Sequence, residues 1–318
     1  MSVPAELPEP ERLSPADVAA LEAEGWVTAR PPKWSEVGSR IIGFPLRVWK
    51  HRDLVVHSSK RELEGRFTGT LLGWLWPLVY PVFMFTVYYF IFTKLLAMKF
   101  PSLPESQKAA MGVYMFVGVM VWAAFAESLV RGCNCIVENG NLIKKLAFPS
   151  ETLPLTVVLV NVITMMFGVV VFLATCFLTP LWIAPGPMLL WIPVLLLVQV
   201  MFTYGFTLLV ATLQVFLRDT MQVVTIGVTI WMFMTPVFWA PEIVQNDWFA
   251  NNMDLFRLNP AYHLVYVWRE VLMSGQPAVV FTYDFAKSLG TLVVWALGTF
   301  TLGYGLFVLC QRRFADEV

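Results

Sequence analysis

Charge is the first thing this sequence has little of. Asp, Glu, Lys and Arg make up 14% of the 318 residues, hydrophobic residues make up 58%, and the formal net charge is zero. A soluble globular domain has about a quarter of its residues charged, so this composition indicates a membrane protein. The zero net charge gives no reason to expect nucleic acid as a partner.

Residues and motifs that carry chemistry are also scarce. Cys133 and Cys135 form a C-x-C pair without a second pair, which is not a zinc spacing, and the three histidines are isolated. We therefore expect reduced thiols and no metal site. The sequence contains no G-x-x-x-x-G-K-[ST] phosphate loop, no H-E-x-x-H and no G-x-S-x-G motif. We predict no catalytic residue and no ATP hydrolysis by this chain alone.

Long apolar runs are what the sequence does contain. A bilayer core about 30 Å thick needs about 20 apolar residues per helix, and six stretches between residues 71 and 310 meet this length. We predict an all-α membrane protein with about six transmembrane helices, over Gly73–Leu96, Ala109–Val130, Leu153–Leu178, Met188–Leu217, Met221–Ala240 and Leu289–Cys310.

The basic residues predict the orientation of these spans. If both termini are cytoplasmic, the inside segments hold 16 of the 22 Lys and Arg residues, as the positive-inside rule requires. Residues 1–40 contain no apolar run of seven or more, so we expect the first span to insert uncleaved. The predicted location is the cell inner membrane. The middle of the spans is nearly free of charge, which argues against ion coupling and for energy supplied from outside the membrane domain.

The segments around the spans have separate patterns. Residues 1–45 are predicted to be a cytoplasmic tail with a short helix at Ser14–Glu24, because seven prolines punctuate them. Residues 46–70 alternate apolar and basic residues, which predicts an amphipathic interfacial helix; a solvated helix face is the alternative. We further expect a cytoplasmic loop over 131–152, an external segment over 241–288 with re-entrant or interfacial helices, and a cytoplasmic tail over 311–318.

Four runs resemble a known family. They are RELEGRFTGTLLGWLWPLVYPVFMFTVYYFIF (Arg61–Phe92), ENGNLIKKLAFPSETLPL (Glu138–Leu155), RDTMQVVTIGVTIWMFMTPVFW (Arg218–Trp239) and NPAYHLVYVWREVL (Asn259–Leu272). Together they resemble the permease subunits of ABC-type polysaccharide exporters, the class that exports O-antigen, capsule and teichoic acid. The resemblance covers roughly 46–314, and the N-terminal 45 residues depart from it.

The resemblance implies an exporter assembled from several parts. Two copies of the permease would form the pore, and a separate dimeric ATPase would bind ATP and Mg beneath it. The substrate would be a glycan on a polyprenyl diphosphate lipid. The second run would be the coupling helix, whose apolar and basic residues fit a cleft in the ATPase; an ordinary solvated loop is the alternative. The coupling residues are Glu138, Asn139, Leu142, Ile143, Lys144 and Lys145.

Two further groups are candidate substrate contacts. Lys60, Arg61 and Arg66 lie just before the first span, where a lipid-linked diphosphate would reach the inner leaflet; attraction to anionic headgroups in general explains them equally well. Aromatic faces stack on sugar rings, so aromatic residues of the first span could line a conduit, whereas interfacial aromatic belts are the alternative. These residues are Trp74, Trp76, Tyr80, Tyr88 and Tyr89.

Two other functions stay open at this point. A drug or lipid exporter permease would have the same topology, although the coupling run disfavours it. A membrane-embedded glycan polymerase or ligase would use carboxylates and arginines, and the external segment holds several, such as Asp254, Arg257 and Glu270. The sequence does not name the glycan, its length, or the role of residues 1–45.

Overall fold

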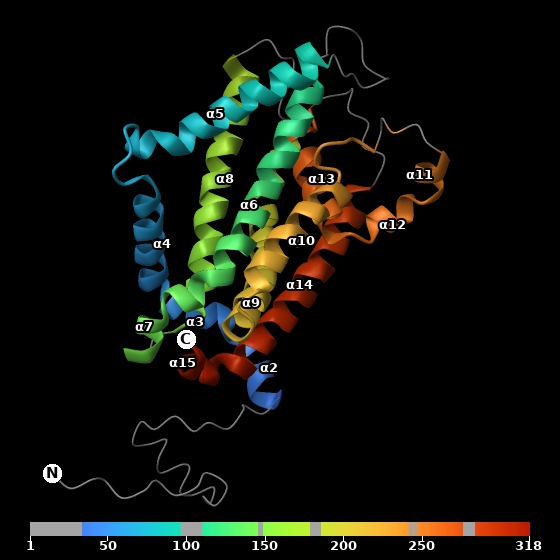
Figure 1. Cartoon of the computed structure of the whole chain (residues 1–318). Coiled ribbons are helices and arrows are strands. Elements are labelled where there is room, and N and C mark those ends of the chain that lie inside the picture. The colour runs from blue at the N-terminus through green and yellow to red at the C-terminus, as the bar shows by residue number, and fades with distance from the viewer. Residues whose placement is uncertain are drawn as a thin grey trace, which may run out of the picture.

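The computed structural model describes residues 34–96, 110–145, 149–178, 186–241, 244, 247–275 and 284–318. Every regular element within these residues is a helix (Figure 1). Five helical stretches are long and apolar enough to cross a membrane, which confirms the predicted all-α membrane class. They are Gly73–Leu95, Met111–Glu138, Thr152–Leu178, Pro187–Phe216 and Phe285–Glu317.

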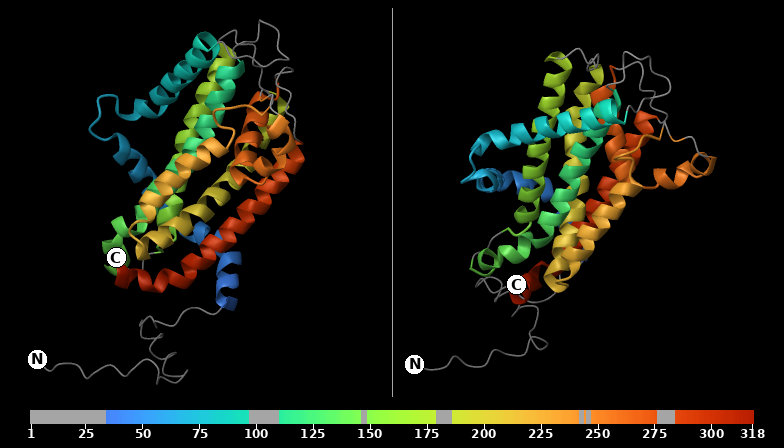
Figure 2. Two further views of the ribbon diagram at one scale, coloured as in Figure 1. Left: turned by 45° about the vertical axis from the view of Figure 1, so that its right-hand side comes forward. Right: turned by 45° about the horizontal axis from the view of Figure 1, so that its top comes forward.

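Four long helices make the central bundle. They are α6 (Ala110–Glu138), α8 (Thr152–Leu178), α9 (Ile192–Phe216) and α14 (Phe285–Cys310). Helix α9 packs against α6, α8 and α14, and its closest crossing with α14 has glycine on both sides (Figures 1 and 2). A Cβ atom on Gly303 would lie 2.1 Å from the carbonyl oxygen of Gly205. Without side chains here, the two backbones approach closely, as membrane helices often do through small residues.

The sixth predicted span is shorter than its sequence suggested. We expected a helix over Met221–Ala240, but α10 covers Thr220–Met234, about 22 Å at 1.5 Å per residue. It ends because Pro236 disfavours helical backbone at the preceding residue, and Thr235 is extended, with φ −101° and ψ 142°. Six membrane-crossing helices are therefore not confirmed.

The first span lies obliquely across the bundle. It consists of a short 3-10 turn (Gly73–Leu75), α5 (Trp76–Tyr89) and a π-helical end (Phe90–Leu95). Only one face of α5 is buried, at Pro77, Pro81 and Phe85, where it crosses α6 and α8. Figure 1 shows α5 leaning away from the bundle toward α4, and Figure 2 shows the same tilt from two other sides.

The N-terminal helices are α2 (Trp34–Ile42), α3 (Phe44–Lys50) and α4 (Arg52–Phe67). Residues 34–45, which we assigned to a tail, therefore include helix and pack on the bundle. The Phe44 ring stacks on Tyr204 at 5.4 Å between centroids. Arg47 donates to the hydroxyl of Tyr304 at 2.6 Å and pairs with Glu151 at 3.2 Å. The predicted helix over 14–24 lies outside the described residues, and the membrane-surface position of 46–70 stays a prediction.

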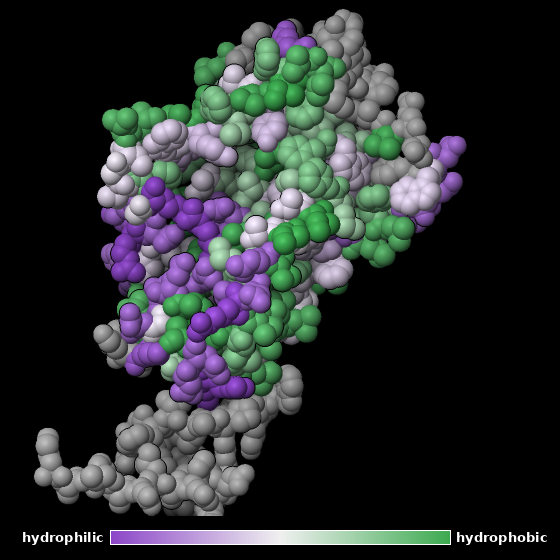
Figure 3. Space-filling model, in the orientation of Figure 1, coloured by the Kyte–Doolittle hydropathy of each residue, from purple (hydrophilic) through white to green (hydrophobic). Residues whose placement is uncertain are grey.

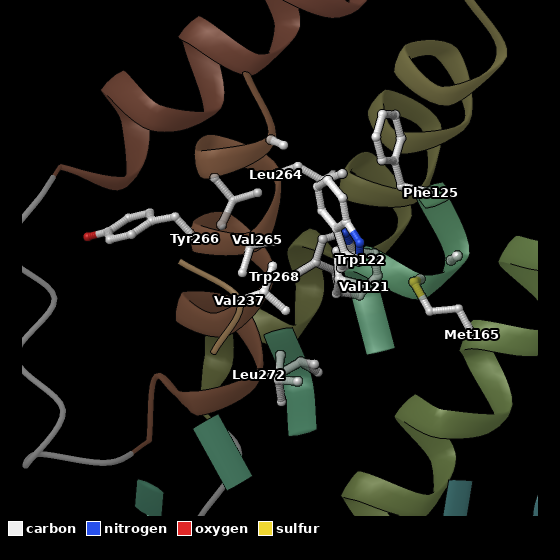
Figure 4. Close-up of a cluster of buried hydrophobic side chains, with 14 of the residues drawn as sticks. Val121, Trp122, Phe125, Met165, Val237, Leu264, Val265, Tyr266, Trp268 and Leu272 are labelled. Carbon is white, nitrogen blue, oxygen red and sulfur yellow. The ribbon is translucent and has the colours of Figure 1, made fainter. Parts of the chain in front are cut away.

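The connection before the last span contains α11 (Asp247–Asn251), α12 (Met253–Arg257) and α13 (Pro260–Met273). Asn259 caps α13 by accepting a hydrogen bond from the Ala261 N–H at 3.0 Å, and Pro260 occupies the first turn. Helix α13 is buried among α6, α9 and α14, and Figure 4 shows its Val265, Trp268 and Leu272 within the cluster of buried hydrophobic side chains. The predicted helical stripe is therefore embedded in protein.

The two ends of the bundle are distinct. One end carries α7 (Gly140–Lys145), the C-terminal α15 (Phe314–Glu317) and the start of α8; we call it the α7 end (Figure 1). The other end carries α13, and we call it the α13 end. The orientation predicted from the basic residues makes the α7 end cytoplasmic.

Candidate functional site

A sharp elbow between α4 and α5 creates the candidate site. Gly69 and Gly73 have φ of 80° and 47°, a left-handed region that L side chains rarely adopt. The Thr70 hydroxyl donates to the Phe67 carbonyl at 2.8 Å and accepts from the Gly73 N–H at 3.1 Å. These contacts fix the turn, so the end of α4 and the inner face of α5 lie against the same part of α8.

Beneath this elbow lies a cavity of about 620 Å³. Helices α5, α6, α8 and α10 all contribute to its walls, and Arg66 at the end of α4 lies at its margin. A smaller cavity of about 340 Å³ adjoins it and shares four of its residues, namely Arg66, Tyr80, Pro81 and Thr164. The two cavities form one hollow whose floor is polar at Arg66 and whose walls toward the α13 end are apolar and aromatic.

Arg66 is held in place on one side only. Its side chain is 12% exposed, and its Nη1 donates to the Oδ1 of Asn161 at 2.8 Å. The Asn161 amide donates in turn to the Ser128 hydroxyl at 3.1 Å, which donates to the Ala124 carbonyl. The Nη2 atom of Arg66 is buried and has no hydrogen-bond partner among the described residues. The N–H groups of Nη2 are therefore available to a ligand in the cavity.

The charges around Arg66 are mixed. Glu62 lies 3.5 Å from Nε of Arg66, while Glu127 lines the larger cavity and pairs with Arg131. Burial, and then the nearby Arg131 cation, lower the pKa of Arg66 below its ordinary value. The carboxylates of Glu62 and Glu127 act in the opposite direction, so the four side chains together carry no net charge. The guanidinium fork of Arg66 suits phosphate oxygens.

The structure separates the three predicted entry residues. Lys60 is exposed and lies 3.8 Å from Glu64 on its own helix, and Arg61 is exposed on the same helix. Neither lines the two cavities. Arg66 alone of the three lines both. The buried face of α4 contains Val55, Ser59 and Leu63, and Arg66 continues that face because residues three and four apart share a side of a helix.

The predicted conduit aromatics are also divided. Tyr80 lines both cavities, Tyr88 lines the larger and Trp76 the smaller. Tyr89 stacks on Phe85 at 6.4 Å between centroids, and Trp74 is 55% exposed in the turn before α5. Tyr80, Tyr88 and Trp76 are therefore placed where a substrate could contact them.

The predicted coupling residues gather at the α7 end. Glu138 is the exposed last residue of α6, Asn139 caps the turn by donating to the Cys135 carbonyl at 2.8 Å, and Lys144 is exposed. Leu142 is half-buried, and Ile143 packs against the core cluster at this end. Lys145 is the last residue of α7. Ile143 thus serves the chain's own fold, which the sequence did not indicate.

Sequence reasoning missed the residues that orient Arg66. Asn161 is a polar residue inside an otherwise apolar span, and that is a signal, because buried polar groups in membrane helices are usually bonded or functional. Ser128 gave no signal, since a serine can bond to its own helix. Glu127 is an ionisable residue within a span, which is also a signal, but its position at the cavity depends on the packing of α6 against α10.

The fold and the cavity define a multi-pass membrane protein with a substrate-sized hollow between the first span and the bundle. The model of the ABC-2 type transporter family matches residues 54–273. The chain belongs to this family.

Curated relatives cover most of the chain. It is 28% identical over 278 residues to the O-antigen export system permease protein RfbA of Myxococcus xanthus, covering 87% of this chain and 100% of that protein. It is 26% identical over 267 residues to the protein of the same name from Klebsiella pneumoniae, covering 83% of this chain and 94% of that one. The resemblance to polysaccharide-exporter permeases is confirmed.

Proposed function

We propose that this chain is the transmembrane subunit of an ATP-driven exporter that moves a lipid-linked polysaccharide across the inner membrane. The substrate would be O-antigen or a similar glycan on polyprenyl diphosphate. The family and the names of the relatives support an exporter permease. The observation that carries the substrate class is Arg66, a buried cation with a spare donor at the polar floor of an otherwise apolar and aromatic hollow.

The hollow suits an amphipathic lipid with a charged head. Asn161 lies nine residues into α8, about 14 Å from the α7 end of that helix. If the α7 end is cytoplasmic, Asn161 and Arg66 would lie on the cytoplasmic side of the middle of α8. A diphosphate at Arg66 would leave the lipid tail beside the exposed face of α5. The first sugars would lie near Tyr80 and Tyr88.

The charge of Arg66 tests this assignment. Arg66→Gln keeps a donor for Asn161 but removes the cation, and Arg61→Gln removes an exposed cation from the same helix. We expect the first variant to lower surface glycan and to accumulate lipid-linked chains on the inner leaflet, with normal membrane levels. We expect the second to export normally. If Arg66→Gln and Arg61→Gln export equally well, the basic cluster has no specific role in substrate binding and serves only general adhesion to the membrane.

A separate ATPase would dock at the α7 end and bind ATP and Mg. Leu142 is the better test residue, because Ile143 packs into the chain's own core. A new charge in an apolar contact costs several kcal/mol, roughly 2 or more. Leu142→Asp should therefore lose co-purification with the ATPase and lose export, while the protein remains in the membrane. Lys144→Ala, on the same exposed turn, is the milder comparison. If Leu142→Asp still binds the ATPase and still exports, α7 is not the coupling element.

Two copies of the chain would form the pore. Outside the buried stripe of α5, large apolar side chains are exposed, among them Phe83 and Phe90, and α10 exposes Ile226, Ile230 and Phe233. Lipid or a second copy would cover these faces. The alternative of a membrane-embedded glycan polymerase or ligase predicts glycan transfer in membranes that lack the ATPase. We expect none in such an assay.

A further inference from the structure

Two stripes of polar residues run along α6 and α10 toward the cavity. On α6 they are Glu127, Arg131 and Asn134, and on α10 they are Gln222, Thr225 and Thr229; all are exposed or half-buried. With 100° of rotation per residue, members of each stripe fall within about 60° of one another on their helix. We call these six residues the polar lane.

The two stripes belong to one surface. Helices α6 and α10 pack against each other, and the Asn134 amide nitrogen lies 3.0 Å from the sulfur of Met221, next to Gln222. At the other end of the lane, Glu127 and Thr229 both line the larger cavity. The lane therefore starts near the turn between α9 and α10 at the α7 end and leads into the hollow that holds Arg66.

The upper end of the lane lies at a depth where an ionisable residue does not face lipid. Glu127 lies 16 residues from Met111, about 24 Å along α6, and an ionisable residue at that depth faces water or protein. Next to the polar stripe, the surface of α10 is apolar, with Val223, Ile226 and Ile230 more than half exposed. Thr229, at the upper end of the α10 stripe, lines the hollow. Figure 3 shows hydrophilic residues gathered over α4 and the α7 end, with hydrophobic ones above.

The hydrogen-bonding groups of the lane suit a neutral polyol. The Thr225 and Thr229 hydroxyls donate to backbone carbonyls at 2.8 and 2.9 Å, so they offer acceptors to a ligand. Gln222 offers both donor and acceptor. Glu127 and Arg131 cancel in charge while keeping bonding capacity. Such separate, weak groups can hold successive sugar hydroxyls without trapping the chain, because a neutral hydrogen bond contributes only about 1 kcal/mol.

We propose that the polar lane binds the carbohydrate part of the substrate and guides it from the α7 end into the hollow. This inference rests on the proposed function. Arg66 would hold the charged head, whereas the lane would contact only a chain that extends beyond it. Mutations could therefore separate the recognition of the diphosphate head from the recognition of the glycan.

A triple variant tests the lane. Gln222→Met, Thr225→Val and Thr229→Val together remove its bonding groups on α10 while nearly keeping side-chain volume. The matched control is Thr291→Val on α14, where the hydroxyl also donates to a backbone carbonyl, at 2.9 Å, but lies on a helix outside the lane. All variants would be reconstituted in vesicles as the whole exporter with its ATPase. Two probes are compared: polyprenyl diphosphate bearing one sugar, and the same lipid bearing an oligosaccharide long enough to cover the lane.

We expect the triple variant to translocate the long probe at least about tenfold more slowly than wild type, as the loss of two or three weak hydrogen bonds implies. It should accept the one-sugar probe normally, and Thr291→Val should handle both probes as wild type does. The polar-lane proposal would be overturned if the triple variant translocated the long probe as fast as wild type does. It would also be overturned if the variant lost the same share of its rate with both probes. If the triple variant fails to fold, the exposed single change Gln222→Met should show the same selectivity with a smaller loss. A wild-type exporter that accepts neither probe would overturn the proposed function itself.

Discussion

Two arginines, Arg269, which is buried, and Arg66, which is partly buried, have opposite surroundings. Arg269 on α13 is 1% exposed. Its guanidinium donates to the carbonyls of Tyr114 at 3.1 Å, Val237 at 2.9 Å and Pro236, and it lies 3.6 Å from the centroid of the Tyr114 ring. Arg66 borders a cavity, makes one hydrogen bond to Asn161, and has a buried Nη2 without a partner among the described residues.

Under the proposed function, this difference would separate a structural role for Arg269 from a binding role for Arg66. The carbonyl oxygens of Pro236 and Val237, in the segment that follows α10, would lose these donors without Arg269. Arg269 satisfies them and joins α13, α10 and α6. Arg66 satisfies one amide and keeps a donor for something absent from the chain. Burial alone therefore does not identify a cation that binds a ligand. The more informative feature is an N–H group of the guanidinium that has no partner among the described residues.

Removing Arg269 should have the largest effect on stability. Arg269→Met fills much of the volume but leaves three buried carbonyls without their donor, at about 1 kcal/mol or more each. We expect a loss of at least about 3 kcal/mol, seen as a low thermal midpoint in detergent and a low membrane level. A variant of normal stability would mean that the carbonyls at Pro236 and Val237 find other donors.

Crowding Arg269 should have an intermediate effect. A Cβ on Gly118 would lie 2.1 Å from its Nη2, whereas a Cβ on Gly227 of α10 meets nothing within 4 Å. Gly118→Ala should destabilise by about 1–3 kcal/mol through overpacking. Gly227→Ala should be neutral or slightly stabilising, because alanine favours a helix. Equal midpoints for the two variants in thermal unfolding would show that the guanidinium can move aside.

Removing Arg66 should change stability little. Arg66→Gln releases a partly desolvated cation and keeps a donor near Asn161, so we expect a change within about 1 kcal/mol. The same variant should lose export, as argued above. A large drop in the thermal midpoint would instead place Arg66 with Arg269 as a structural residue, and the comparison would fail.

The smallest effect concerns Glu270, next to Arg269 in the chain. Its Oε2 atom is buried without a hydrogen-bond partner among the described residues. Burial raises the pKa of Glu270 from 4.5 to about 7, and Asp284 adds to the rise. The folded protein therefore binds this proton more tightly than the unfolded chain. The stabilisation is complete below the unfolded pKa and is lost as the pH rises through about 7.

Because Glu270 is only partly buried, solvent screens the effect, and we expect less than about 1 kcal/mol. The measurement is the difference between the thermal midpoints of Glu270→Gln and wild type as a function of pH. That difference should grow in favour of the glutamine as the pH rises through neutrality. A pH-independent difference would show that Glu270 stays charged throughout.

The predictions from sequence succeeded where local pattern decides structure. The five long spans follow from runs of apolar residues. The short helix at 140–145 was expected only from the resemblance of the run Glu138–Leu155 to a coupling helix. The prediction for α10 was too long, because its apolar run continues past Pro236, whose effect on Thr235 is backbone geometry rather than hydropathy. The tail over 34–45 was mispredicted because Phe44 and Arg47 pack on Tyr204, Tyr304 and Glu151, which lie far apart in the sequence.

The candidate site could be predicted only in part, and Arg66 shows why. In the sequence, Lys60, Arg61 and Arg66 form one basic cluster. Helical spacing could place Arg66 on the face of Val55 and Leu63, but the sequence did not state which face of α4 meets α8. The glycine elbow, the packing of α4 on α8, and Asn161 decided that Arg66 alone borders the cavity.

The sequence by itself determined that this protein is a bundle of membrane helices and that it belongs to a family of exporter permeases, because hydropathy and motif order are properties of the chain. The tertiary structure decided which charges are satisfied and which remain available. Arg269 meets three carbonyls, one from α6 and two from the segment that follows α10, and Arg66 meets one amide and a cavity. The physical reason is that a hydrogen bond depends on distances of about 3 Å between groups, and those distances are set by packing between helices remote in sequence.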